Sequence, residues 1–462
     1  MKKSLLNLAA LMLGIALANT LSNAQVYTDL YNFDGTHGSY PGYPDILAQG
    51  RDGNLYGTAP DGGSNCQPTG CGVVFRVTPA GTLSVLHDFD AIHGNGPESG
   101  LTLATDGSLY GTTAAGASSG FGTIFRGVPG GLGKFLYTFG GGADGGNPWA
   151  PPIQGTDGNF YGTTTYNRAA YRIAPLGHFT VLGLLPGDSW APLLQASDGN
   201  FYGTTVSGGG PGCQRGGCGT VFKMTPSGTV TGVHIFVNND GASPYAPVVE
   251  GSDGSLYGTA FSGGAYGHGV VFRIAPHGLF TVLHNFPDPN YPNDGIDPYA
   301  APVLASDGNL YGVTSMGGTN TFWGVIFQIT PAGDYSILYN FDYTDGAEPT
   351  STPVQHTNGK LYGMTSVGGI SKLGVLYSFD MGLPPFVRLV STSGIVGQTI
   401  GILGQGFTGT TNVSFNGTSA AFTVASDTYL TATAPVGTTT GYVTVTTPAG
   451  TLTSNAPFHV IP

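Results

Sequence analysis

Aromatic side chains at one recurring position are the strongest candidates for contact with a ligand. They stand eight residues before a repeated Asp in four successive units, as Trp149, Trp190, Tyr245 and Tyr299. The same position in the other units holds Pro44, Glu98 and Thr350. Aromatic faces beside polar loops can stack on sugar rings or on peptide prolines, whereas buried rings pack neighbouring sheets together. Both interpretations remain open, and each predicts an arc of rings on one face.

Acidic side chains near these aromatics could perform a second kind of chemistry. The loop carboxylates are Asp144, Asp188, Asp240, Asp294 and Asp345. Carboxylates bind calcium together with loop carbonyls, and paired carboxylates do acid–base work, as Glu98 and Asp188 would in an enzyme. Turn formation explains an Asp-Gly pair equally well. The D-x-D-x-D-G spacing of a calcium loop is missing from the sequence, so we predict no metal and no cofactor.

Four cysteines occur as two close pairs, Cys66 with Cys71 and Cys213 with Cys218. Both pairs fall in the same loop of their units. Two cysteines without a nearby partner pair are too few for a structural zinc site. In an exported chain they favour two local disulfides, each closing a Gly-rich loop.

A repeated segment must position these residues. A D-G-[NS]-[LF]-Y-G-T core starts at Asp52, Asp106, Asp157, Asp198, Asp253 and Asp307, and a variant of it starts at Asn358. The starts are separated by 54, 51, 41, 55, 54 and 51 residues, a period typical of propeller blades. Asp-Gly suits a tight hairpin turn, and alternating apolar residues with turns at about ten-residue spacing indicate four short strands per unit. The sequence thus predicts an all-β, seven-bladed β-propeller over residues 25–382.

The two ends of the repeat region complement each other. The last unit stops after a third strand, and residues 26–34 (V-Y-T-D-L-Y-N-F-D) match the fourth-strand pattern of residues 336–342. An N-terminal strand that completes the last blade would close the propeller and remove its open sheet edges.

The repeat resembles the GloVer tandem repeat of secreted bacterial proteins through L-Y-G-T-T, the Gly-Gly loop and G-x-V-F-[KR]. The resemblance covers roughly residues 26–380 and implies architecture and export, with no assigned reaction.

The C-terminal segment, residues 383–462, has a different pattern. After Pro384-Pro385 the repeat core disappears, and Thr, Val and Gly increase. The motifs G-x-x-G-x-G-F from Gly401 and V-x-F-N-G from Val413 resemble the IPT/TIG immunoglobulin-like family. This resemblance implies a β-sandwich that serves as a spacer, an adhesion module or a dimerisation element.

The N-terminus reads as a signal peptide over residues 1–24, with a basic start, an apolar run and a small-residue cleavage site. We expect a secreted or cell-surface protein, extracellular or periplasmic, without an integral membrane span after cleavage. The net charge is −12, and the sequence lacks the clustered Lys and Arg that nucleic acid binding requires, so we expect no nucleic acid partner.

These observations predict a secreted, non-enzymatic binding or adhesion protein whose loop face presents a surface to an extracellular glycan or protein. Two alternatives remain: a hydrolase or lyase that acts on extracellular polysaccharide, and a structural surface or matrix component.

Overall fold

The computed structural model describes residues 25–42, 46–128, 130–210, 213, 216–288, 293–319 and 323–461. Throughout these residues the chain forms strands and turns and contains no helix, which confirms the predicted all-β class. The predicted signal peptide and Pro44 lie outside the described residues. None of the described residues belongs to a helix with the length and apolarity needed to cross a bilayer.

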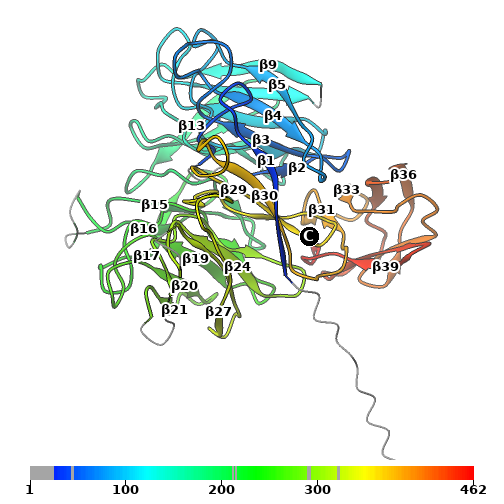
Figure 1. Cartoon of the computed structure of the whole chain (residues 1–462). Helices are drawn as coiled ribbons and strands as arrows, with labels where there is room; N and C mark the ends of the chain where they lie inside the picture. The colour runs from blue at the N-terminus through cyan, green and yellow to red at the C-terminus, as the bar shows by residue number, and fades with distance from the viewer. Residues whose placement is uncertain are drawn as a thin grey trace, which may run out of the picture.

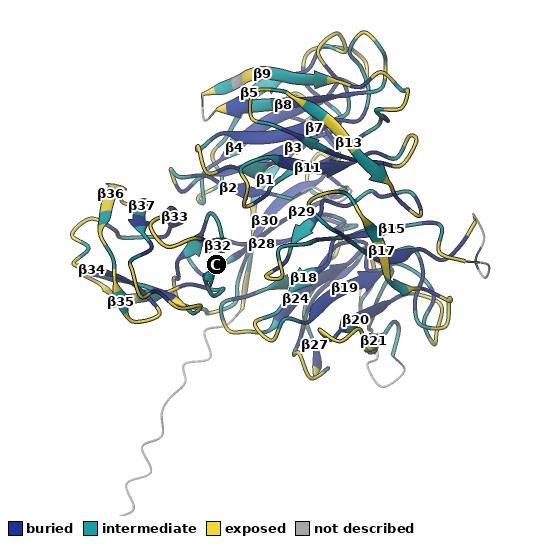
Figure 2. Cartoon of the chain, turned by 180° about the vertical axis from the view of Figure 1, so that it is seen from behind, coloured by how far each residue is buried: buried dark blue, intermediate teal, exposed yellow. Residues whose placement is uncertain are grey.

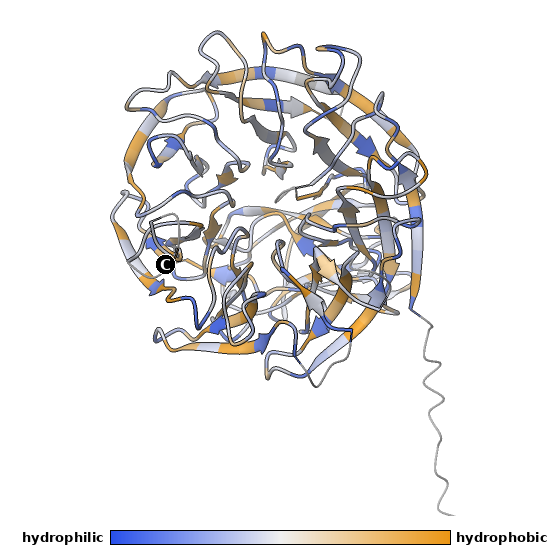
Figure 3. Ribbon diagram, turned by 60° about the vertical axis from the view of Figure 1, so that its left-hand side comes forward, coloured by the Kyte–Doolittle hydropathy of each residue, from blue (hydrophilic) through white to orange (hydrophobic). Residues whose placement is uncertain are grey.

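Seven four-stranded antiparallel sheets occupy the described part of the repeat region, and Figure 3 shows them set around a ring. The first is β2 (Ala48–Gln49), β3 (Leu55–Ala59), β4 (Val73–Val77) and β5 (Leu83–Asp88). The second is β6 (Thr102–Leu103), β7 (Leu109–Thr113), β8 (Thr123–Val128) and β9 (Gly131–Thr138). The third is β10 (Ile153–Gln154), β11 (Phe160–Thr163), β12 (Ala169–Ile173) and β13 (Phe179–Leu184). The fourth is β14 (Leu194–Gln195), β15 (Phe201–Thr205), β16 (Thr220–Met224) and β17 (Val230–Ile235).

The remaining sheets follow the same plan. The fifth is β18 (Val249–Glu250), β19 (Leu256–Ala260), β20 (Val270–Ile274) and β21 (Phe280–Asn285). The sixth is β23 (Val303–Leu304), β24 (Leu310–Thr314), β26 (Val325–Ile329) and β27 (Tyr335–Asn340), beside a small pair of β22 (Gly295–Ile296) and β25 (Met316–Gly317). The seventh is β28 (Val354–Gln355), β29 (Leu361–Thr365), β30 (Val375–Asp380) and β1 (Val26–Asn32).

The first half of the repeated core builds a hairpin between the first and second strands of a sheet. The Asp52 carboxylate accepts the backbone N–H of Asn54 at 3.2 Å, and Gly53 takes the positive φ of +76° that this turn needs. The Tyr56 hydroxyl donates to the same carboxylate at 2.8 Å. The recurring Asp and Tyr are therefore explained by a local turn.

In the second half of the core, the Gly leaves room for a ring of its own sheet, and the Thr joins that sheet to the next one. A Cβ on Gly57 would lie 2.6 Å from the ring of Phe75, so a larger residue there would displace that ring. Thr58 accepts the backbone N–H of Gly100, in the next sheet, at 3.0 Å. Equivalent threonines donate to carbonyls of the following sheet, Thr112 to Ala150, Thr204 to Ala246 and Thr259 to Ala300.

The hydrophobic core lies between the faces of neighbouring sheets, where Figure 2 shows the buried strands. In the described chain, every neighbouring pair among the seven sheets shares a cluster of buried side chains, the last and first included. At that last seam Phe33 and Phe75 pack with Met364 and Leu376.

A polar contact repeats near the hairpins. Gln49 donates from Nε2 to the Thr357 hydroxyl at 2.7 Å and accepts the Thr357 N–H at 3.1 Å, so it ties the first sheet to the seventh. Each contact uses the side chain three residues before the hairpin Asp or Asn. The others join Gln154 to Thr105, Gln195 to Thr156, Glu250 to Ser197 and Gln355 to Ser306.

Strand β1 pairs with β30 from Val26 opposite Asp380 to Asn32 opposite Val375. The Tyr27 ring stacks on Tyr339 of the sixth sheet with centroids 4.3 Å apart. The N-terminal segment thus occupies the outer position of the seventh sheet, as its sequence pattern predicted.

The C-terminal unit has two further four-stranded sheets and a core of its own, and it lies beside the ring in Figure 1. One sheet contains β31 (Arg388–Leu389), β33 (Thr399–Leu403), β37 (Tyr429–Thr433) and β36 (Phe422–Ser426). The other contains β35 (Thr418–Ser419), β34 (Asn412–Phe415), β38 (Val443–Thr447) and β39 (Gly450–Thr453). A parallel pair joins β32 (Ser393–Gly394) and β40 (His459–Val460).

This unit docks on the hairpins of the first and seventh sheets. The Thr428 hydroxyl donates to the Arg51 carbonyl at 2.7 Å, and the Arg51 guanidinium lies 4.4 Å from the centre of the Tyr429 ring. Gln405 donates to the Thr357 hydroxyl at 3.0 Å. The C-terminal unit therefore bridges the seam where the two ends of the repeat region meet.

Two disulfides close loops of the first and fourth sheets, Cys66–Cys71 and Cys213–Cys218. Each follows the second strand of its sheet, where the sequence placed it.

Candidate ligand-binding face

The four aromatic residues come together in one continuous row, which we call the aromatic arc (Trp149, Trp190, Tyr245 and Tyr299). Trp149 and Trp190 are stacked with centroids 4.9 Å apart. Trp190 meets Tyr245 edge-on at 5.2 Å, and Tyr245 stacks on Tyr299 at 4.5 Å. The sequence predicted this arc, and the structure brings all four members into contact across the third to sixth sheets.

The inter-sheet threonines hold the arc in place. Thr112 of the second sheet donates to the carbonyls of Pro148 and Ala150, which flank Trp149. The residue after Tyr245 and the residue after Tyr299 are held in the same way by Thr204 and Thr259. The backbone beneath the arc is therefore fixed by the repeat itself.

Exposure differs along the arc. Trp149, Trp190 and Tyr245 are half-buried, whereas Tyr299 is buried at 9% exposure. Phe261, from the loop after β19, contacts both Tyr245 and Tyr299 edge-on. The rings thus pack against one another and also leave part of their surface open.

Glu98 occupies the arc position of the second sheet, next to Trp149 around the ring. Its neighbour Ser99 bonds to Thr112, which in turn holds the backbone on both sides of Trp149. Desolvation raises the pKa of Glu98 to about 7, and the nearby Asp61 charge adds to this shift. Burial also raises the pKa of Asp61. A carboxyl group that titrates near neutral pH can donate or accept a proton there.

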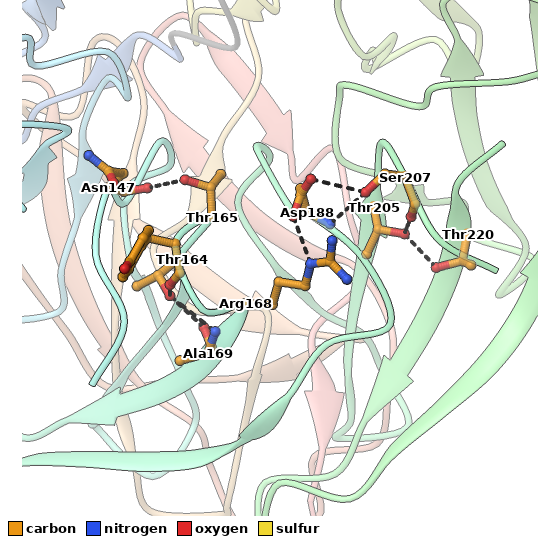
Figure 4. A network of polar contacts seen from close by, with 10 residues as sticks. Asn147, Thr164, Thr165, Arg168, Ala169, Asp188, Thr205, Ser207 and Thr220 are labelled. Atoms are coloured by element: carbon orange, nitrogen blue, oxygen red, sulfur yellow. Dashed lines mark hydrogen bonds and ion pairs between the residues drawn. The ribbon is translucent and has the colours of Figure 1, made fainter. Parts of the chain in front are cut away.

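Asp188 lies in a different setting, shown in Figure 4. Its carboxylate pairs with Arg168 at 2.8 Å and accepts the Ser207 hydroxyl at 3.1 Å. Asp188 therefore joins the Arg168 loop to the loop after β15.

The other loop carboxylates hold their own loops against the outer strands. Asp144 accepts the Tyr137 hydroxyl at 3.0 Å and the Gly140 N–H at 2.6 Å. Comparable contacts join Asp240 to His234, Asp294 to His284 and Asp345 to Tyr339. Within the described residues, no three His, Cys, Asp or Glu side chains are grouped to hold a metal ion.

Two cavities lie away from the arc. One of about 460 Å³ is lined by Asp61, Tyr40 and Gln67 on the loops of the first sheet. Another, of about 570 Å³, lies between the ring and the C-terminal unit.

Comparison with protein families assigns the chain. The Gloeobacter/Verrucomicrobia repeat matches residues 13–174 and 189–446. The chain belongs to this repeat family. No curated protein matches its sequence.

Solved structures similar to this Gloeobacter/Verrucomicrobia repeat protein share its β-propeller-like fold. A streptogramin B lyase is 14% identical with a TM-score of 0.53, and the match covers 77% of this chain and 97% of that one. An inactive variant of virginiamycin B lyase from Staphylococcus aureus, with quinupristin, is 14% identical over 77% and 99% with the same TM-score. The periplasmic gluconolactonase of Pseudomonas aeruginosa is 17% identical over 68% and 93%, with a TM-score of 0.43. The likeness rests on the two lyases, and at these identities it concerns the fold alone.

Sequence reasoning missed some features of the repeat protein. Phe261 was overlooked because it follows the repeated core, at a position where the other units carry no aromatic residue. The contact from Gln49 to Thr357 had a visible signal, since a Gln or Glu stands three residues before the hairpin in five of the seven units. The interface of Arg51 with Tyr429 left no recognisable signal in the sequence.

Proposed function

We propose that this repeat protein is a secreted, non-enzymatic glycan-binding protein built on a closed seven-bladed β-propeller. The proposal divides the chain into a signal peptide (1–24), the propeller (25–382) and an immunoglobulin-like domain of the IPT/TIG type (383–462). The buried clusters at all seven seams and the pairing of β1 with β30 support the closed ring. The two sheets and separate core of the C-terminal unit support a β-sandwich.

The aromatic arc is the observation that carries the binding function. Sugar rings present C–H groups that pack on aromatic faces, and their hydroxyls bond to polar groups alongside. Trp149 and Trp190 are already stacked on each other, and Thr112 holds the backbone beside Trp149. Less side-chain freedom is then lost on binding, which favours affinity.

Binding to an array of plant and microbial glycans tests this function. The Trp149→Ala, Trp190→Ala double variant should bind its best glycan roughly tenfold to a hundredfold more weakly than the wild type, since two stacking contacts are lost. Tyr266→Ala is the matched control, because Tyr266 is 48% exposed on a loop outside the arc. Equal binding by the double variant and the wild type would contradict the proposal.

A second candidate function, an enzyme that acts on extracellular polysaccharide, is favoured by Glu98. With a pKa of about 7 and Asp61 close by, Glu98 fits a general acid beside an aromatic platform. Turnover of a polysaccharide panel by the purified protein tests this candidate. Activity should fall as pH rises through about 7 and should drop roughly a hundredfold or more in Glu98→Gln, and Glu348→Gln should retain it. Turnover that survives in Glu98→Gln would exclude this residue as the acid.

A further inference from the structure

A second site lies at the opposite end of the sheets from the aromatic arc. Two cavities of about 570 and 310 Å³ open between the hairpins of the ring and the C-terminal unit. They share Ser252, Leu304 and Asn455 as wall residues, so they lie next to each other. We call the two together the interdomain cavity. Its volume is in the range that holds a small ligand, and domain interfaces are common places for such sites.

Arg388, from β31, lines the inner part of the interdomain cavity. Its Nη2 donates to the Gln355 carbonyl at 2.6 Å, which uses one of five guanidinium N–H groups. Among the described residues no carboxylate forms an ion pair with it, whereas Arg126, Arg168 and Arg273 each have one. Burial lowers the pKa of Arg388 to about 10, so the group remains positively charged at neutral pH.

The acidic residue in this inner part, Glu250, forms hydrogen bonds to a neighbouring sheet. Glu250 lines the same wall, but its two carboxylate oxygens accept the backbone N–H of Ser197 at 2.8 Å and the Ser197 hydroxyl at 2.5 Å. Glu250 thereby joins the fifth sheet to the fourth. Glu250 therefore does not neutralise the charge of Arg388.

The outer part of the interdomain cavity provides an aromatic surface among polar groups. Tyr442 is 44% exposed and lines this part together with Ser306, Asp307 and Asn455. An exposed ring beside hydroxyl, carboxylate and amide groups suits a sugar, whose faces are apolar and whose edges carry hydroxyls.

We propose that the interdomain cavity binds a short acidic oligosaccharide, with a uronate carboxylate on Arg388 and a sugar ring on Tyr442. A guanidinium binds a carboxylate through paired, charge-assisted hydrogen bonds, which makes Arg388 the residue that distinguishes acidic from neutral sugars. The site stands on residues separate from the aromatic arc, so it does not depend on the glycan-binding role of that arc.

Calorimetric titration with trigalacturonic acid and with neutral galactotriose tests the proposal on the full chain. We expect the acidic trimer to bind and the neutral one to bind at least tenfold more weakly. Arg388→Met should weaken binding of the acidic trimer by roughly tenfold to a hundredfold, as expected for loss of a charge-assisted contact. Arg388→Lys should retain part of the affinity.

Tyr442→Ala tests the site independently of any folding defect in the Arg388 variants, because Tyr442 is 44% exposed. This variant should weaken binding of the acidic trimer and leave the melting temperature of the protein unchanged, with Tyr266→Ala as the matched control. The Trp149→Ala, Trp190→Ala variant should bind the acidic trimer as the wild type does. Equal affinity for the two trimers, no binding of either, or full affinity in Arg388→Met would overturn the proposal.

Discussion

A chain that begins at Gly35, without β1, should fail to form a stable monomer. The deletion removes the outer partner of β30 and leaves a sheet edge open to other molecules. It also removes Phe33, which is 0% exposed in the cluster between the seventh and first sheets. Losing a buried Phe costs about 3–5 kcal/mol, against a total stability on the order of 5–15 kcal/mol. Size-exclusion chromatography and thermal unfolding measure the outcome.

Point variants show how much of the stability comes from the packing of Phe33 and how much from the strand as a whole. Phe33→Ala should lower the free energy of unfolding by about 3–5 kcal/mol, because it leaves a cavity at the seam. Val26→Ala, at a side chain that is 51% exposed, should change it by no more than about 0.5 kcal/mol. A monomeric deletion variant with the wild-type melting temperature would show that β1 is dispensable and that the ring does not depend on it.

Replacing Glu98 with Gln should make the protein more stable at alkaline pH. The folded-state pKa of Glu98 is raised from 4.5 to about 7 by desolvation and by Asp61. Stability linked to a raised pKa is fully present below the unfolded value and is lost as pH rises through the folded value. The wild type therefore loses stability between pH 4.5 and about 7, by on the order of 3 kcal/mol.

Chemical denaturation from pH 4 to pH 8 checks this effect. Glu98→Gln and the wild type should have similar stability near pH 4, where Glu98 is protonated, and the variant should be the more stable at pH 8. The control Glu348→Gln keeps Glu98 in place, so it should retain the wild-type loss of stability. A parallel pH dependence in Glu98→Gln and the wild type would mean that Glu98 is not desolvated.

Much of the fold could be predicted because contacts between residues close in sequence specify each repeat. Asp52, Gly53 and Tyr56 specify a hairpin through contacts within five residues, and the same letters recur around the chain. The match of the N-terminal segment to a fourth strand predicted its pairing with β30, since alternating side chains fix strand register. The spacing of the cysteines predicted two local disulfides for the same reason.

Part of the candidate site could also be predicted. A fixed offset from the hairpin predicted the arc from Trp149 to Tyr299, because equivalent positions of neighbouring sheets lie side by side in a ring. The roles of the carboxylates could not be told apart in this way. Asp188 and Asp144 read alike in sequence, yet one pairs with Arg168 and the other accepts the Tyr137 hydroxyl.

The sequence by itself therefore determined the strands, their order and the face that carries the aromatic arc, since these follow from short-range turn chemistry and from the repeat period. Only the tertiary structure decided the raised pKa of Glu98, the position of Arg388 and the interdomain cavity. The physical reason is that desolvation and charge pairing depend on which distant segments pack around a group. Arg388 meets Gln355 only because the C-terminal unit docks across the seam of the ring.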